Sequence, residues 1–198
     1  MFKRRFNFLR KDDLNWIDVC IRMEGEELYA KFIELLQQEN SMDMNIAREP
    51  LPLSMTFSEV ETMAKHLSSQ LEILESLGYS LLFWQAANIL WINKEFYLLA
   101  DLTQRVPLHK KNLTQLVLNY PAVFPLPKRE CAPEVLQMKA LPFITHKSCS
   151  YYSLALLCLA KLNLSLAEMP DVLHGTKLFY FLERCLKEEP VERLLINV

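Results

Sequence analysis

The strongest constraint on the fold is a stripe of apolar residues within 57–77. Its members recur three or four positions apart, the spacing at which side chains share one face of an α-helix. Thr56 precedes the stripe, and Glu59 follows Thr56 by three residues, which is a signature of a capped helix start. Gly78 comes directly after the stripe, where helices often end. We therefore predict a helix over 57–77. The stripe consists of Val60, Met63, Ala64, Leu67, Leu71, Leu74 and Leu77.

Short apolar runs and prolines follow this helix. The runs 89–92 and 96–100 flank three polar residues, which is typical of a hairpin. Residues 104–133 contain five prolines, and proline lacks an amide donor and fixes φ. We therefore predict an extended loop there, with one helical turn at 112–117.

Two further helices are predicted near the end of the chain. Residues 150–162 are apolar on nearly all sides, so this helix should be buried. Residues 176–187 place apolar side chains on one face and end before Pro190.

The N-terminal part is shorter and less regular. Residues 16–22 alternate imperfectly and favour a strand, and residues 26–38 favour an amphipathic helix. A polar, proline-containing connector follows over 38–53. We place a domain boundary there, with a small unit over 1–52 and a larger one over 53–198.

Composition excludes several classes of protein. With 198 residues and 51% hydrophobic content, the chain can bury a core without disulfides. A net charge of −2 leaves no basic surface typical of nucleic-acid binding, and no apolar run is long enough to cross a bilayer. The five cysteines have no paired spacing and no secretory leader precedes them, so we expect reduced thiols and a cytoplasmic location.

Five short motifs occur in a fixed order on the predicted elements. They are Asn88-Ile89-Leu90, Asp101-Leu102-Thr103, Ala132-Pro133-Glu134, Tyr152-Ser153-Leu154, and Arg184-Cys185-Leu186 with Pro190-x-x-Arg193. In this order and at these separations they resemble the C-terminal lobe of a protein kinase. The resemblance covers roughly residues 56–198. It implies an α+β, mainly α, kinase-like C-lobe with a truncated small N-terminal lobe.

The resemblance also indicates which catalytic groups are missing. Phe83 stands five residues before Asn88, where a kinase has the aspartate that accepts the substrate proton. Gln85 replaces the lysine that contacts the transferred phosphate, and Leu82 replaces an arginine that senses a phosphorylated activation loop. The three glycines are isolated, so no glycine-rich loop can cover phosphates. We therefore predict that the chain is not an enzyme.

Asn88 and Asp101 match the pair that holds magnesium in active kinases. One interpretation is vestigial binding of magnesium and nucleotide by these two residues. The other is that Asn88 ties the loop backbone together and Asp101 caps a turn. We favour the second, because no other part of a nucleotide site survives, and we predict no bound cofactor or metal.

The support of the catalytic loop is also altered. In kinases an aspartate on the buried central helix holds that loop, and Ser150 stands in its place here. We expect an apolar plug of Leu81, Phe83 and Trp84 to substitute for the lost polar support.

The structural residues are retained. The resemblance implies that Glu134 pairs with a buried arginine, Arg193. We therefore predict a pseudokinase that acts as a scaffold, decoy or allosteric regulator. Its partner would be a protein, with an active kinase or its substrate as candidates, and neither nucleic acid nor membrane; self-association is left open. The alternatives are a divergent nucleotide-binding protein or weak serine/threonine kinase using Asn88 and Asp101, and an unrelated helical adaptor.

Overall fold

The computed structural model gives the chain an α+β fold with five α-helices and antiparallel sheets among its described residues. The fold class is therefore confirmed at this level. The predicted strand at 16–22 and helix at 26–38 lie outside the described residues. The structure describes residues 48–92, 94, 96–99, 102, 104–119 and 126–195.

Helix α4, Phe57–Ser76, confirms the helix predicted from the apolar stripe. The capping box is present: the Thr56 hydroxyl accepts from the Glu59 amide at 3.3 Å, and the Glu59 carboxylate accepts from the Thr56 amide at 2.7 Å. Gly78 follows with a φ of +84°, a left-handed conformation that ends the helix without strain. The stripe is fully buried over most of its length.

A three-stranded antiparallel sheet lies against α4. It has the order β1-β3-β4 and is built from Arg48–Pro50, Ile89–Ile92 and Phe96–Leu99. Strands β3 and β4 form the predicted hairpin, in which Ile89 pairs with Leu99. Strand β1 precedes the boundary predicted near residue 52 and pairs with β3, while the division into two domains stays a prediction.

The second sheet has four antiparallel strands in the order β2-β5-β6-β7. The helical turn predicted at 112–117 is wrong, because this segment belongs to β6 and pairs on both sides. The extended loop predicted over 104–133 is wrong over β5 and β6 as well. The prolines misled the prediction: none lies within 112–117, and Pro107 lies inside β5 opposite Tyr79. The strands are β2 Tyr79–Leu81, β5 Arg105–His109, β6 Asn112–Leu118 and β7 Phe143–His146.

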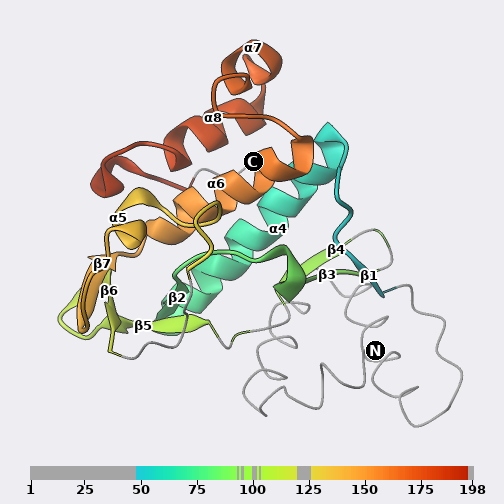
Figure 1. The fold of residues 1–198 in the computed structure, drawn as a ribbon. Helices are drawn as coiled ribbons and strands as arrows, with labels where there is room; N and C mark the ends of the chain where they lie inside the picture. Colours follow the sequence, from blue (N-terminus) through green and yellow to red (C-terminus); the bar gives the residue numbers. More distant parts are fainter. Residues whose placement is uncertain are drawn as a thin grey trace, which may run out of the picture.

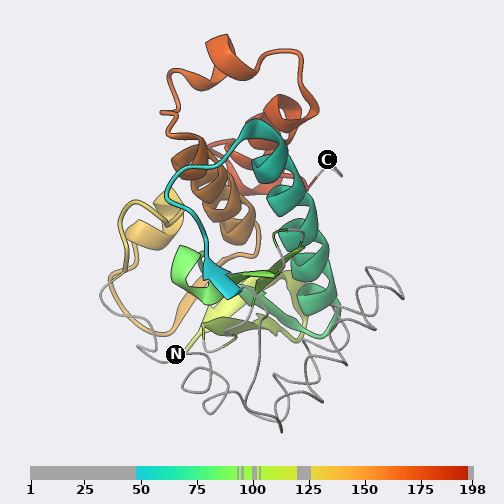
Figure 2. The ribbon, with the colours of Figure 1, turned by 90° about the vertical axis from the view of Figure 1, so that its right-hand side faces the viewer.

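Four helices follow in the C-terminal half, and two of them confirm the predictions at 150–162 and 176–187. Helices α4 and α6 lie side by side, and α8 lies across the far side of α6 (Figures 1 and 2). Among the described helices, none is both long and apolar enough to span a membrane. The four are α5 Pro133–Leu136, α6 Cys149–Leu162, α7 Met169–Leu173 and α8 Lys177–Cys185.

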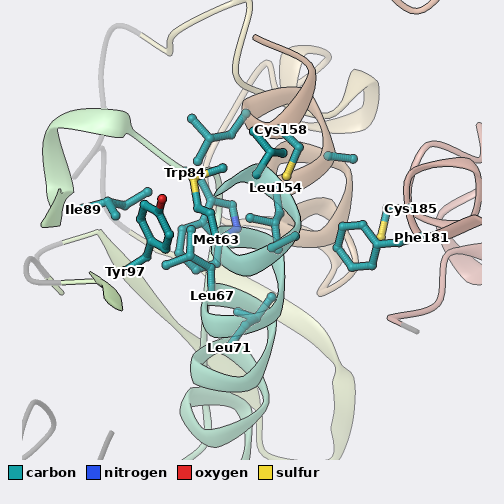
Figure 3. Packing of buried hydrophobic residues seen from close by; sticks show 14 of the residues in the cluster. Met63, Leu67, Leu71, Trp84, Ile89, Tyr97, Leu154, Cys158, Phe181 and Cys185 are labelled. Carbon is teal, nitrogen blue, oxygen red and sulfur yellow. The ribbon is translucent and has the colours of Figure 1, made fainter. Parts of the chain in front are cut away.

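The buried side chains form two apolar clusters. The larger lies between α4, α6, α8 and the first sheet, and Figure 3 shows Met63 and Leu67 of α4 facing Leu154 and Cys158 of α6. The smaller lies between the second sheet and the starts of α5 and α6. Each sheet thus covers one cluster.

Gln70 closes the outer edge of β4. Its side chain is 2% exposed, its Nε2 donates to the Tyr97 carbonyl at 2.8 Å, and its Oε1 accepts from the Leu99 amide at 2.9 Å. The amide of Gln70 therefore replaces the neighbouring strand that an edge otherwise needs.

We predict that Gln70→Leu lowers the free energy of unfolding by about 2 kcal/mol or more, because two buried backbone groups lose this partner. Urea denaturation measures the change. Ser69→Ala is the matched control, since the exposed Ser69 hydroxyl bonds only within its own helix, and it should change stability by less than about 0.5 kcal/mol. Equal stability of Gln70→Leu and wild type would contradict the role of Gln70.

Candidate functional site

Residues 81–84, where the resemblance places the catalytic loop, are buried. Leu81 and Trp84 belong to the larger apolar cluster, whereas Leu82 and Phe83 belong to the smaller one. Phe83 is 1% exposed. The position at which a proton acceptor is missing therefore lies inside the core rather than at a surface that a substrate could reach.

Helix α6 holds this segment with hydrogen bonds from its first turns. The Trp84 amide donates to the Ser153 hydroxyl at 2.7 Å, and the Trp84 indole N–H donates to the Ser150 carbonyl at 3.0 Å. The Cys149 thiol lies 3.8 Å from the Leu81 carbonyl oxygen. These contacts satisfy polar groups that burial would otherwise leave without partners.

The predicted plug residues Leu81, Phe83 and Trp84 are buried but divide between two clusters, and polar support, which we expected to be lost, is present in another form. Ser150 contributes its carbonyl, while its hydroxyl donates to the Lys147 carbonyl at 2.7 Å and lies 3.3 Å from the Ser80 hydroxyl. Ser153, one helical turn later, makes the side-chain contact to the loop backbone, and sequence reasoning missed that role. Its signal was its spacing of three from Ser150 on a buried helix, which places both on one face.

A buried carboxylate joins α4, β2 and the start of α6. The Lys147 ammonium pairs with Glu75, and the same Glu75 oxygen accepts from the Tyr151 hydroxyl at 3.1 Å. The Ser80 hydroxyl donates to the other oxygen at 3.4 Å. Burial, followed by the charge of Glu75, raises the pKa of Tyr151, so its hydroxyl stays protonated and can donate. The sequence pattern did not indicate this network.

The structure describes Gln85, which replaces the phosphate-contacting lysine, and Asn88 of the predicted vestigial magnesium pair. The Gln85 side-chain oxygen accepts a hydrogen bond from the Gln104 side-chain nitrogen Nε2 at 2.8 Å, so it already has a partner within the chain. Asn88 ends the short 3₁₀ turn Ala86–Asn88 and is half-buried. Asp101 lies outside the described residues, so whether it meets Asn88 stays a prediction.

The structure places Glu134 and Arg193 in contact. The two terminal nitrogens of Arg193 donate to the two carboxylate oxygens of Glu134, at 2.5 and 3.0 Å. Arg193 also donates to the carbonyls of Lys187 and Glu188, at 2.7 and 2.8 Å. The arginine is 2% exposed and the carboxylate side chain is 22% exposed. The hydrogen bonds from the Arg193 guanidinium to Glu134 and to two carbonyls offset the cost of burying its positive charge.

Neighbouring contacts attach this ion pair to α6. The Arg193 guanidinium lies 4.7 Å from the centre of the Tyr152 ring, a cation–π geometry. The Ser148 hydroxyl donates to the Pro190 carbonyl at 2.6 Å. Burial lowers the pKa of His146, which lies 2.7 Å from the same hydroxyl. The segment 190–193 is therefore fixed to α5 and to the first turn of α6.

The thiols of the four described cysteines lie in environments that do not activate them. Burial raises the pKa of Cys131 to about 12 and raises the pKa of the other described cysteines as well. They stay protonated near neutral pH and are poor nucleophiles. All four are free and buried: Cys131, Cys149, Cys158 and Cys185. Cys20 lies outside the described residues.

Helix α6 therefore holds the loop 81–84 in place, and residue 83, a buried phenylalanine, offers no accessible acid or base. Comparison with known proteins adds no assignment. No protein-family model matches the chain, and no curated protein is similar to it in sequence.

We predict that Arg193→Ala lowers the free energy of unfolding by about 3–5 kcal/mol, because Glu134 and two carbonyls lose their partner while still buried. Glu134→Gln should destabilise in the same direction by less, since an amide can still accept one hydrogen bond. Thermal and urea unfolding measure both changes.

Arg184→Ala is the control, because Arg184 is an exposed arginine on α8. Unfolding of Arg193→Ala at the wild-type midpoint would remove the structural role of the pair.

Proposed function

We propose that this chain is a catalytically inactive protein kinase-like domain that acts by binding another protein, as a scaffold, decoy or allosteric regulator. The order of elements supports the proposal: a capped helix, a buried loop, a hairpin, a short helix beginning at Pro133 and a buried central helix occur in this order, with strands β2, β5, β6 and β7 between them. Of the motifs of the resemblance, those at 88–90, 132–134 and 152–154 lie at the start of the hairpin, at α5 and on α6, and the motif at 184–193 follows at the end of α8 and beyond it.

The observation that carries the proposal is the burial of Phe83. A general base must reach the proton that it removes, and must therefore face the substrate. Phe83 instead fills the apolar cluster under the second sheet. Loss of the base is accompanied here by a repacked loop, so a single substitution does not separate this chain from an active enzyme.

Retention of the structural groups is the second support. Arg193 and Glu134 are paired, and Ser153 holds the loop backbone. A protein that acts by binding needs its fold but no catalytic group, since its folded surface carries the function. An active kinase or its substrate remains the candidate partner.

A specific observation keeps one alternative open, a nucleotide-binding protein or weak serine/threonine kinase that uses Asn88 and Asp101. Ile89 pairs with Leu99, so the chain enters β3 and leaves β4 at the same end of the hairpin, next to Asn88. The unrelated helical adaptor is weaker, because two antiparallel sheets stand beside the helices.

We predict that magnesium and ATP together do not raise the melting temperature. Ligand at a hundred times its Kd would stabilise the fold by about 2.7 kcal/mol, so even modest affinity is measurable. A clear shift that Asp101→Asn abolishes would favour the nucleotide-binding alternative. Transfer of labelled phosphate that Asn88→Ala removes would refute the inactive assignment.

We also predict that Phe83→Asp does not create kinase activity and instead destabilises the fold by at least about 3 kcal/mol. The substitution deletes a buried ring and places a carboxyl group in an apolar cluster. Urea unfolding and a phosphate-transfer assay test the two parts. Gln85→Lys is the control: Gln85 is half-buried, so this variant should fold and also stay inactive.

A further inference from the structure

Strand β7 is the outer strand of the second sheet, with β6 as its only neighbour in the described sheet. The Lys147 amide donates to the Thr114 carbonyl at 2.8 Å, which fixes the alternation of the antiparallel ladder. Thr145, which pairs with Leu116, therefore directs its backbone groups toward β6. Ile144 and His146 direct their N–H and C=O groups away from the sheet.

The side chains along this edge alternate as well. Thr145 is 7% exposed and faces the core, whereas Ile144 is 53% exposed on the opposite face. Val117 pairs with Ile144 and lies on the same outer face. Leu113, four residues earlier on β6, is 62% exposed. The outward-facing backbone of β7 thus lies beside apolar side chains on the outer face of β7 and its neighbour β6, a template for a further strand.

Two lysines that the structure shows exposed lie near one end of the edge, while Lys147 beside them pairs with Glu75. No aspartate or glutamate occurs between residues 102 and 129, a stretch that supplies β5 and β6. Lys110 and Lys111 are exposed at the turn between these strands. Because β6 runs antiparallel to β7, this turn lies at the same end of the sheet as Lys147. The edge therefore complements an acidic ligand.

We propose that the β7 edge binds an extended acidic segment of a partner protein, which adds to the sheet as a further strand. The proposal rests on the proposed function in that the chain works by binding a protein. Backbone hydrogen bonds to Ile144 and His146 supply affinity, and Lys110 and Lys111 select for acidic side chains. A second copy of this chain fits less well, because its own β7 edge carries no carboxylate to meet these lysines.

The probe is a fluorescent peptide of about ten residues that alternates glutamate and valine, long enough for one strand. It is compared with the same peptide carrying lysine in place of glutamate, and with one methylated on alternate backbone nitrogens. We expect the full chain to bind the acidic peptide and to bind each of the other two at least about tenfold more weakly. Binding should also weaken as salt concentration rises.

Variants of the chain locate the peptide. Ile144→Pro removes one outward N–H while leaving the ladder to β6 intact, so it should weaken binding at least about tenfold. Ile144→Thr keeps that N–H and a branched side chain, and it should keep the backbone contribution. Lys110→Glu should weaken binding of the acidic peptide, and adding Lys111→Glu should weaken it further. Lys177→Glu, the same charge change as Lys110→Glu at an exposed position of α8, should not weaken it.

Three outcomes overturn the proposal. The first is binding that neither methylation nor Ile144→Pro reduces in a protein that still melts cooperatively. The second is no binding of any peptide by the folded chain. The third is a dimer, measured by analytical ultracentrifugation, that Ile144→Pro converts to a monomer, because a second copy then occupies the edge. Phosphate transfer by a chain that binds the peptide would instead refute the inactive assignment and leave the edge site standing.

Discussion

Burial of residues 81–84 between two apolar clusters is the constraint on which the rest of the structure depends. Trp84 enters the cluster shared by α4 and α6, and Phe83 enters the cluster under the second sheet. A loop can lie this deep only if its backbone polar groups find partners. Helix α6 supplies them through Ser153 and the Ser150 carbonyl. The central helix, the loop and the two sheets therefore form one packing unit.

Buried charges follow the same rule. Glu75 is surrounded by Lys147 and two hydroxyl donors, and Arg193 is surrounded by Glu134 and two carbonyls. Each group is desolvated, and each is matched by opposite charge and by hydrogen bonds. Both networks contact residues at the first turn of α6. The first extends from α4, and the second extends from α5 and from the segment 190–193. Loss of one partner in either network would leave a charge that the interior cannot solvate.

These features relate the proposed function to the fold. Where a kinase exposes an acid to its substrate, this chain has a buried ring and a repacked loop. Strands β5 and β6 before α5 and strand β7 after it extend the second sheet, and β7 is its outer strand among the described residues. Under the function that we propose, the interior stabilises the loop and the surface binds the partner. The outward backbone groups of the β7 edge and the lysines near it are the basis for the proposed class of partner.

The sequence by itself determined the elements whose signals are local. The apolar stripe and the capping box specified α4, two apolar runs around three polar residues specified the β3–β4 hairpin, and apolar content specified buried α6. Only the tertiary structure decided what depends on distant neighbours. Strand β6 was predicted as a helical turn because its pairing with β5 and β7 is invisible in a local pattern. The roles of Ser153, Gln70 and Glu75 were missed for the same reason: each depends on a partner far away in the sequence, and only packing brings the two together.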